Sequence, residues 1–552
     1  MLDRENNYVM DDYQKKSIFY SFLPGISGEK GIPLWCHYLN RGQGIASFGG
    51  QDKDHGIMEF YPAHQAAQRT PLLGFRTFLK IGGKFQEAFA DYDTADEMVI
   101  GMNSLVLREK MKKAGLMVEV EYESLPEEPV AGLLRKVTVR NAGRKERCVE
   151  IADGMAELLP YGVSSSSMKE MGQTTKAWMQ VLDVEKSVPV YKVRASMEDS
   201  ACVTEVNGVH YGLAREENGE LLPVIVDREV LFQEDTSLRY PHGFVQNTTE
   251  KLLEAKQCTC NDAACCFFLA KRTLQPGEEM ILEELYGMAE SKEILEQLIK
   301  RTQEPKWFDK KRQIAARLTR QLTDRIATRT GNQVFDAYCR QTYLDNLLRG
   351  GYPVQIGNKV VYLYSRKHGD MERDYNYFSM LPEYYSQGNG NFRDVNQNRR
   401  CEPQFAPFVG DRNIRLFYNA LQIDGYNPLK IEKVSYILDK KEFTPGELYQ
   451  SLEQKNGPKQ KEETDREFAQ LLSKSEEKET TSFGEGYWCD HWIYNLDLVE
   501  SYLGVFPEKK EALLFEDNSY TYRQSEAHIL PRAKRYAKTP DGIRQYHFLE
   551  MP

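Results

Sequence analysis

Residues 115–125, GLMVEVEYESL, decide the fold of the first half of the chain. Apolar and charged side chains alternate along this stretch with a period of two residues. Successive side chains of a β-strand point to opposite faces, so the alternation predicts a strand with one buried and one solvated face. Such half-buried strands are typical of antiparallel sheets.

Two longer stretches continue the pattern on both sides of a turn. Residues 133–154, LLRKVTVRNAGRKERCVEIADG, contain an Asn-Ala-Gly turn, and residues 265–289, CCFFLAKRTLQPGEEMILEELYGMA, contain Pro276-Gly277. Each predicts two strands joined by a turn. Many short strands with regular turns predict a large antiparallel sandwich over residues 1–290.

The hydrophobic period changes near Ser291. Residues 291–302, SKEILEQLIKRT, predict a helix, and residues 335–353, FDAYCRQTYLDNLLRGGYP, predict another that ends at Gly350-Gly351. Between them a helical stripe at four-residue steps is formed by Ile314, Leu318, Leu322 and Ile326.

We therefore expect linker helices over residues 291–330 and a mainly helical domain over residues 331–552. Residues 440–485 are charged and interrupted by Gly and Pro, which predicts a solvated excursion with one or two short helices. The last residues, GIRQYHFLEMP, carry no cap or polar tail, so we expect a fragment or a domain completed by another chain.

Composition excludes several classes of protein. The chain has 552 residues and a net charge of −10, which argues against a general binder of nucleic acid or membrane surfaces. It has a polar N-terminal stretch and no run of eighteen apolar residues, so we expect a cytoplasmic protein without a membrane helix. Ten scattered cysteines fit reduced thiols.

Four of these cysteines are close in sequence, at positions 258, 260, 265 and 266. Their spacing fits no zinc pattern, and the last two lead into the apolar run Phe267-Phe268-Leu269. We expect them to be buried or edge thiols of a strand, and no His/Asp/Glu spacing elsewhere implies a metal.

Residues 386–400, SQGNGNFRDVNQNRR, combine glycines, amides, an aspartate and three arginines without a hydrophobic period. Tyrosines and arginines are dense on both sides of them. Aromatic rings suit the C–H faces of a sugar, Arg, Asn, Gln and Asp suit its hydroxyls, and Arg also suits phosphate. Composition alone does not decide between a ligand-binding loop and a solvated, salt-bridged loop.

Residues 483–508, FGEGYWCDHWIYNLDLVESYLGVFPE, form a second dense stretch. Leu496, Leu498, Val499 and Leu503 predict an amphipathic helix, and Asp490 stands at its start between two tryptophans. The aspartate could be an N-cap, or a carboxyl whose pKa is raised by apolar neighbours for use as a general acid.

The two stretches, in this order, resemble motifs of the inverting glycoside phosphorylases of the cellobiose phosphorylase group. FRDVNQN, residues 392–398, is similar to that group's Arg-Asp-Gln-Leu-Gln-Asp loop, which binds the glucosyl unit in the −1 subsite. YWCD, residues 487–490, resembles its Asp-Trp-Asn-Asp motif, whose last aspartate is the catalytic acid. Asn398 and Tyr487 depart from the group's aspartates, and the wider sequence looks more like its larger relatives that act on β-1,3-glucan oligosaccharides.

The resemblance implies a β-supersandwich, linker helices and an (α/α)6 barrel that is incomplete in this chain. It implies phosphorolysis of β-linked gluco-oligosaccharides to α-glucose 1-phosphate. Asp490 would be the single general acid, inorganic phosphate would be the co-substrate, and no cofactor is implied. The sugar-binding residues would be Arg393, Asp394, Gln397, Asn398, Tyr487, Trp488, His491 and Trp492. Available phosphate ligands are Arg366, His368, Arg399 and Arg400.

Two alternatives stay open. An inverting hydrolase on the same scaffold would need a second carboxylate as base, either Asp394 or Glu372. A non-catalytic carbohydrate-binding fragment would bind oligosaccharide and turn nothing over until a partner chain, or a second copy in a homodimer, completed the barrel.

Overall fold

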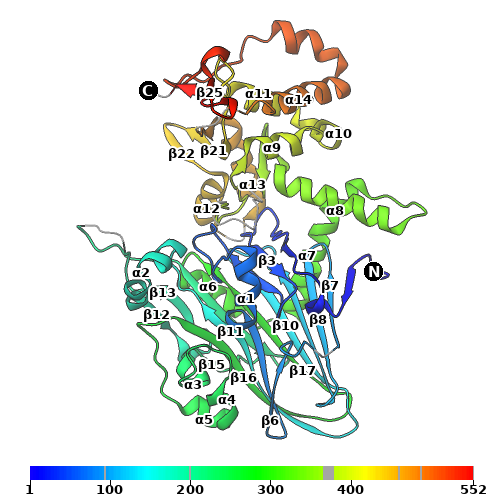
Figure 1. Cartoon of the computed structure of the whole chain (residues 1–552), viewed down its shortest axis with the longest axis vertical. Helices are drawn as coiled ribbons and strands as arrows, with labels where there is room; N and C mark the ends of the chain where they lie inside the picture. Colours follow the sequence, from blue (N-terminus) through cyan, green and yellow to red (C-terminus); the bar gives the residue numbers. More distant parts are fainter. Residues whose placement is uncertain (93–94, 198–200, 365–377, 458–459, 485–487, 551–552) are drawn as a thin grey trace. The chain divides into compact units, whose positions relative to one another are not determined.

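The computed structural model describes residues 1–92, 95–197, 201–364, 378–457, 460–484 and 488–550 (Figure 1). Contacts divide the described chain between Cys339 and Arg340 into two compact units. Both units mix helices and strands. The predicted three-part division, at residues 290 and 330, and the barrel expected for residues 331–552 stay predictions.

The first unit contains two large antiparallel sheets and a small one. The larger sheet has nine strands in the order β1 (Tyr8–Asp11), β7 (Ala95–Ile100), β8 (Ser104–Met111), β9 (Leu116–Ser124), β10 (Ala131–Asn141), β17 (Glu279–Ala289), β14 (Val209–Glu216), β13 (Val190–Val193) and β12 (Met179–Leu182). The second has five, β15 (Val224–Ile225), β16 (Ala264–Leu274), β11 (Arg147–Leu158), β5 (Phe75–Ile81) and β6 (Lys84–Ala88). The small sheet consists of β2 (Tyr20–Leu23), β3 (Trp35–Leu39) and β4 (Ile45–Gly49).

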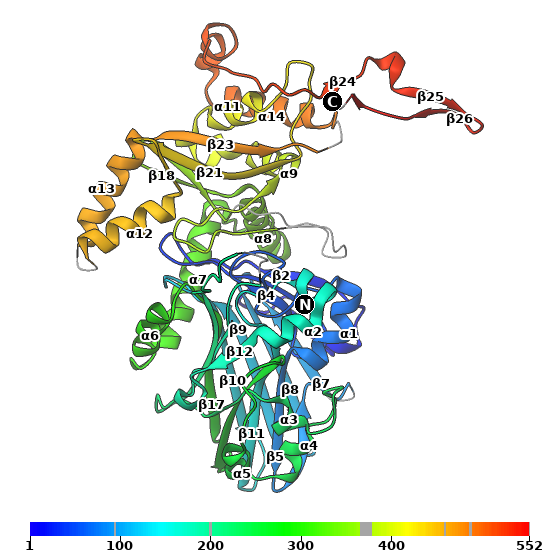
Figure 2. The same ribbon diagram turned by 90° about the vertical axis from the view of Figure 1, so that its left-hand side faces the viewer.

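The sheets pack face to face, as the sandwich prediction required. One continuous core contains Val118 and Val120 of β9 together with Val149 and Ile151 of β11. Along β9 buried and half-buried residues alternate without interruption, which confirms the strand predicted from residues 115–125. Figure 2 shows the long strands β10, β17, β11 and β5 running in similar directions.

The two predicted turns connect different sheets and do not close hairpins. The first turn connects β10 of the nine-stranded sheet to β11 of the five-stranded sheet. The second turn connects β16 of the five-stranded sheet to β17 of the nine-stranded sheet. Instead β10 pairs with β9 and β17, and β11 pairs with β5 and β16. Local sequence predicted the strands correctly. A short polar turn can close a hairpin within one sheet or connect two sheets, so the turn does not show which strands pair.

A fully buried arginine joins the two sheets in this core. Arg135 of β10 contacts Asp153 of β11, and its Nη1 also donates to Glu284 Oε2 of β17 at 2.6 Å. All three side chains have 0% exposure. Burial, and then the charge of Asp153, raises the pKa of Glu284 well above its ordinary value. One guanidinium therefore supplies the cation for two buried carboxyl groups, whose other hydrogen bonds come from the hydroxyls of Thr77 and Tyr286.

The helices of the first unit cover its sheets and lead to the second unit. They are α1 (Ala63–Leu73), α2 (Ser165–Trp178), α3 (Arg228–Phe232), α4 (His242–Gln246), α5 (Thr249–Glu254), α6 (Lys292–Arg301) and α7 (Trp307–Thr323). α6 starts where predicted, because the Ser291 side chain accepts a hydrogen bond from the Ile294 N–H. α8 (Gln333–Gly350) runs across the division between the units and ends at the predicted glycine.

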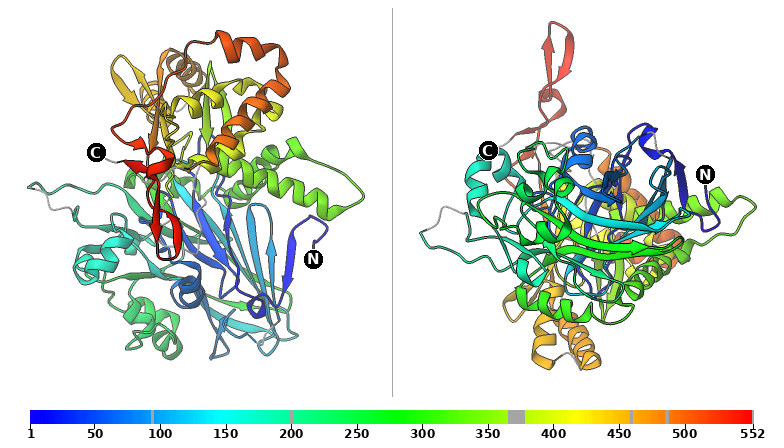
Figure 3. Two further views of the ribbon diagram at one scale, coloured as in Figure 1. Left: turned by 45° about the horizontal axis from the view of Figure 1, so that its top comes forward. Right: turned by 90° about the horizontal axis from the view of Figure 1, so that it is seen from below.

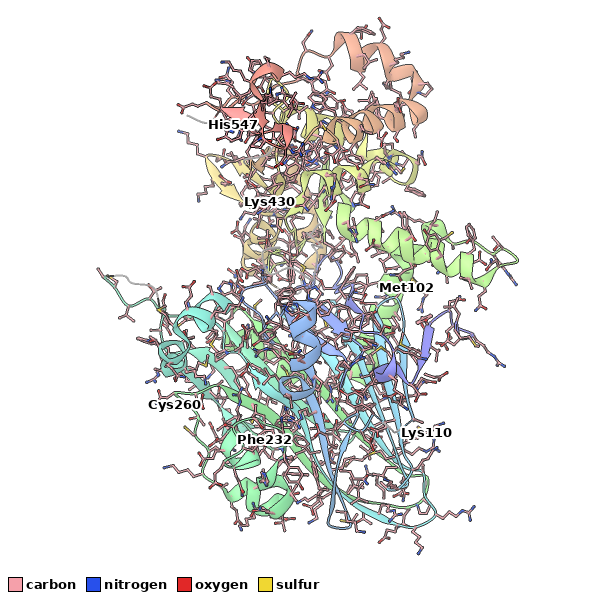
Figure 4. The ribbon with its side chains drawn as sticks, in the orientation of Figure 1. Met102, Lys110, Phe232, Cys260, Lys430 and His547 are labelled. Carbon is pink, nitrogen blue, oxygen red and sulfur yellow. The ribbon has the colours of Figure 1, made fainter. Side chains whose placement is uncertain are left out.

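The clustered cysteines divide into two kinds. Cys265 and Cys266 are buried in β16, as expected for small apolar side chains, whereas Cys258 and Cys260 are exposed before the strand (Figure 4). In the described part of the chain no group of three or more His, Cys, Asp or Glu side chains is placed to hold a metal ion. Nor does any described helix have the length and apolar character needed to cross a membrane.

The second unit is less helical than the sequence predicted. Its helices are α9 (Phe392–Arg399), α10 (Glu402–Phe405), α11 (Arg412–Asn419), α12 (Pro445–Asn456), α13 (Lys461–Lys474) and α14 (His491–Val505). Its strands are the hairpin β18 (Tyr352–Ile356) and β19 (Lys359–Leu363), a sheet of β20 (Gly390–Asn391), β21 (Lys430–Leu438), β22 (Lys441–Phe443) and β23 (Glu476–Ser482), and the short pairs β24 (His528–Ile529) with β27 (Leu549–Glu550) and β25 (Tyr536–Thr539) with β26 (Gly542–Gln545). Figure 3 shows the last hairpin in red.

The excursion predicted over residues 440–485 contains the two helices α12 and α13, of 12 and 14 residues. It also contains β23, whose sequence, EEKETTS, has no apolar residue. This strand pairs with β21 although it lacks a hydrophobic face, and for that reason the strand was not predicted from periodicity.

We predict that Arg135→Met destabilises the protein by about 3–5 kcal/mol, because it leaves Asp153 and Glu284 buried without their cation. Urea denaturation followed by circular dichroism measures the change. The matched control is Arg140→Met on the same strand, since Arg140 meets Glu279 at 3.7 Å with exposures of 47% and 41%. This control should cost less than about 1 kcal/mol. Equal stability of the Arg135 variant and the wild type would contradict the structural role of the arginine.

Candidate functional site

The glycine- and amide-rich segment is buried, which excludes the solvated-loop interpretation. Residues 383–390 are all buried, and Gly390 and Asn391 form β20, which pairs with β21. The side chain of Gln387 donates to the Val434 carbonyl at 2.9 Å and accepts from the Val434 N–H at 3.2 Å. The amide side chain thus pairs with both backbone hydrogen-bonding groups of a buried strand residue.

The sequence FRDVNQNR that follows is a helix, α9, and the predicted loop is wrong here. Its buried residues are Phe392, Val395, Asn396 and Arg399, which is the i, i+3, i+4, i+7 spacing of one helical face. Two of these four positions are polar, so a search for apolar periodicity does not detect the helix.

The first turn of α9 presents an arginine and an aspartate. Arg393 is exposed, and its Nε lies 3.3 Å from Asp394 Oδ1. Asp394 also accepts a hydrogen bond from the Asn391 side chain at 3.0 Å. A carboxylate in the first turn is favourable because the helix N-terminus carries partial positive charge.

The second predicted helix is confirmed as α14, which begins at His491. Asp490 occupies the N-cap position, but its side chain accepts no capping hydrogen bond. The N-cap interpretation therefore does not account for this carboxyl group. The buried face of the helix consists of His491, Asn495, Leu498 and Tyr502, whereas Leu496, expected in the apolar stripe, is 53% exposed.

α9 and α14 pack against each other in parallel. The ring of Phe392 stacks on His491 with centroids 5.0 Å apart and planes at 20°. One turn further along both helices Asn396 Nδ2 donates to Asn495 Oδ1 at 2.5 Å. Beyond these, Arg400 Nη1 lies 3.0 Å from Asp497 Oδ2.

Because the contacts advance along both helices in the same direction, the two N-termini lie at the same end. Asp490 at the start of α14 is therefore beside Arg393 and Asp394 at the start of α9. Both helix dipoles direct their positive ends to this place.

The charged groups at this end of the helices act on the pKa of His491. Burial lowers the pKa of His491 to about 4, and the charge of Arg393 acts in the same direction. The carboxylates of Asp490 and Asp394 oppose the shift. Residues of both sequence motifs thus act on one imidazole, which is neutral at physiological pH.

Aromatic surface adjoins the same end of the helices. The indole of Trp488 stacks on His491 with centroids 6.2 Å apart and planes at 22°, so that His491 has an aromatic neighbour in both Trp488 and Phe392. Trp488 and Trp492 are 41% and 39% exposed. They offer rigid faces beside Asp490 on which an apolar sugar face could stack.

The other predicted sugar-binding residues lie one turn along α9. Gln397 is exposed, and the Asn398 side chain donates to the Asp394 carbonyl within the helix at 2.6 Å. Tyr487 lies outside the described residues, as do the predicted phosphate ligands Arg366 and His368 and the alternative base Glu372.

The remaining two predicted phosphate ligands have protein partners. Arg399 is buried, its Nε donates to the Gly350 carbonyl at 2.5 Å, and its guanidinium lies 3.4 Å from the ring centroid of Tyr362. Burial lowers the pKa of Arg399, which marks it as a packed structural cation. Arg400 is half-exposed and paired with Asp497, as described above.

One supporting residue was not identified from the sequence. The buried side chain of Asn427 donates to the Trp488 carbonyl at 3.2 Å and fixes the chain just before α14. The neighbouring Tyr426 hydroxyl donates to the Gly484 carbonyl at 2.5 Å. The Asn427-Pro428 pair is a turn signal, but nothing in it indicates which segment the turn contacts.

Comparisons with known proteins give distant structural likenesses. No family model and no curated protein matches the chain. A bacterial glucoamylase in complex with acarbose is 9% identical over 90% of this chain and 68% of its own, with a TM-score of 0.40. A human-microbiome protein described as a kojibiose phosphorylase is 6% identical over 75% of this chain and 45% of its own, with a TM-score of 0.26. Scores this low do not establish a common fold.

We predict that His491 stays neutral above pH 5 in the folded protein, because burial holds its pKa at about 4. The ordinary value is 6.5, so the unfolded chain binds a proton between these two values and folding stability falls as the pH drops from 6.5 towards 4. NMR of ¹³C-histidine-labelled protein, assigned with His491→Gln, measures the titration.

His55 is the internal reference in the same spectra. Its hydrogen bond to Asp52, at 2.8 Å, raises its pKa above 6.5, so its signal should titrate at higher pH than that of His491. A His491 signal that titrates near 6.5 would contradict the buried, stacked ring.

Proposed function

We propose that this protein is an inverting glycoside phosphorylase, which cleaves β-linked gluco-oligosaccharides with inorganic phosphate and releases α-glucose 1-phosphate. One observation carries the proposal. Two motifs that are distant in sequence, Arg393-Asp394 and Trp488 to Asp490, lie at the same end of two parallel helices. This is the pairing of sugar-binding loop and acid motif that the resemblance to the cellobiose phosphorylase group implies.

The sugar is held by stacking and by directed hydrogen bonds. Trp488 and Trp492 supply exposed aromatic faces, and Trp488 is fixed by its stack on His491. Arg393 and Asp394 supply a donor and an acceptor for hydroxyl groups, with Gln397 and Asn398 one turn further along α9. Donors on one helix and aromatic faces on the other would fix the orientation of one sugar ring.

Asp490 acts as the general acid. Its side chain makes no capping hydrogen bond, so the carboxyl group is not held by the helix backbone and could donate a proton to the glycosidic oxygen. The bond between the anomeric carbon and that oxygen breaks as the proton is transferred. Phosphate attacks the anomeric carbon from the opposite face, and a β-linkage therefore gives an α-phosphate.

No catalytic base is needed when the nucleophile is already an anion. Inverting hydrolysis requires a second carboxylate to activate water, whereas phosphate requires positive charge to bind. The paired N-termini of α9 and α14 and the exposed Arg393 provide positive potential at this end. Arg366, His368 and Arg400 remain candidate phosphate ligands.

Inverting hydrolysis is the second candidate function, because a second carboxylate is present. Asp394 stands in the first turn of α9, at the same end of the helix pair as Asp490. As a base it would activate water on the face opposite Asp490. The two functions differ in their requirement for phosphate.

The test is product release from β-1,3-, β-1,4- and β-1,2-linked gluco-oligosaccharides with and without inorganic phosphate. Phosphate-dependent release of sugar 1-phosphate is the expected result and also identifies the linkage. Free sugar at equal rates in both conditions would support the hydrolase. Binding of a sugar without any product would mean that the chain is only a carbohydrate-binding part of an enzyme.

We predict that Asp490→Asn lowers kcat by about 10²–10⁴-fold, since the variant cannot donate a proton and general acid–base catalysis contributes a factor of this size. Rates of sugar 1-phosphate release measure the loss, and circular dichroism checks the fold. Glu500→Gln removes an exposed carboxylate of the same helix and should change kcat less than about twofold. An active Asp490→Asn variant would remove Asp490 from the mechanism.

A further inference from the structure

The contact between α9 and α14 contains a polar pair where apolar residues would be expected. Asn396 and Asn495 are both 0% exposed, and one hydrogen bond of 2.5 Å joins their amides. The second amide atom of each, Asn396 Oδ1 and Asn495 Nδ2, is buried without a partner. A buried amide that makes only part of its hydrogen bonds lowers stability compared with an apolar residue of the same size.

The pair lies next to the proposed site. Asn396 is one turn beyond Phe392 on α9, and Asn495 is one turn beyond His491 on α14. Phe392 and His491 are themselves stacked, with Trp488 on His491. Any shift at the amide pair would therefore move the ring stack that adjoins Asp490.

The amide hydrogen bond allows only one register between the helices. A slide of one helical turn, about 5.4 Å, would set Asn396 near Val499 or His491 and leave its donor buried without Asn495. Two apolar side chains at these positions would tolerate a slide or rotation, because dispersion contacts have no direction. Buried polar residues are known to specify register at the expense of stability.

We propose that Asn396 and Asn495 are positioning residues, which lock the register of α9 against α14 and so align Asp490 with Arg393 and Asp394. This inference rests on the proposed function. Neither asparagine need touch substrate: both act through the helices that carry the acid and the sugar-binding groups.

The test is the double variant Asn396→Leu/Asn495→Leu, since leucine keeps the branched shape of the asparagine side chain and removes both amides together. We expect an unchanged or higher urea midpoint, a kcat reduced about 10–100-fold and a KM changed less than about threefold, because small misplacements of catalytic groups mainly slow chemistry. The single variants each leave one amide unpaired and should lower the midpoint.

The matched control is Asn456→Leu in the same unit. Asn456 also bridges two helices, from the end of α12 to Thr464 and Glu467 of α13, at 3.3 and 3.2 Å. This variant should keep kcat within about twofold of the wild type. A similar loss in the control would show that any helix-bridging asparagine affects catalysis, and would overturn the proposal.

A second readout does not depend on activity. The His491 ring signal of ¹³C-histidine-labelled protein senses the ring currents of Phe392 and Trp488, so a lost register should shift or split it in the double variant. An unchanged His491 signal together with wild-type kcat in the double variant would overturn the proposal. Parallel losses of urea midpoint and kcat would also overturn it, because they would indicate that the asparagine pair only stabilises the fold. Absence of any glycoside activity in the wild type would contradict the proposed function alone, and the His491 signal would still decide the positioning role.

Discussion

The candidate site depends on one contact, the parallel packing of α9 against α14. Three contacts that advance along both helices, the Phe392–His491 stack, the Asn396–Asn495 hydrogen bond and the Arg400–Asp497 ion pair, fix the direction and register of α9 and α14. The parallel arrangement places two positive helix ends, an arginine, two aspartates and two exposed tryptophans together. No single element could present this combination.

Both units use buried polar groups to fix an arrangement that apolar packing alone would leave less defined. In the first unit Arg135 binds Asp153 across the sandwich and Glu284 on its own sheet, so the two sheets can meet in only one register. In the second unit the two asparagines do the same for two helices. Each arrangement stabilises the fold less than apolar side chains would, but it allows only one relative position of the packed elements. A single relative position matters most where the groups of a site must be aligned.

Regular periodicity in the sequence predicted the parts of the fold whose buried positions are apolar. β9, the strand segments around both turns, α6 and α8 have mainly apolar buried positions. α14 was predicted from Leu498, Val499 and Leu503, although His491 and Asn495 occupy half of its buried face. The two sheets joined by each turn could not be predicted, because pairing depends on contacts distant in sequence. α9 was missed because Asn396 and Arg399 occupy half of its buried face, and β23 because it has no apolar residue.

The residues of the site could be named from their motifs, but their convergence needed the structure. The most direct test of the account is the configuration of the first product, followed by ¹H and ³¹P NMR while the wild-type protein cleaves a β-linked gluco-oligosaccharide in phosphate buffer. The account predicts that an α-linked sugar 1-phosphate is the first new species to appear. A free sugar as the first product, or a β-linked phosphate, would contradict phosphorolysis by a single general acid at the paired helix ends.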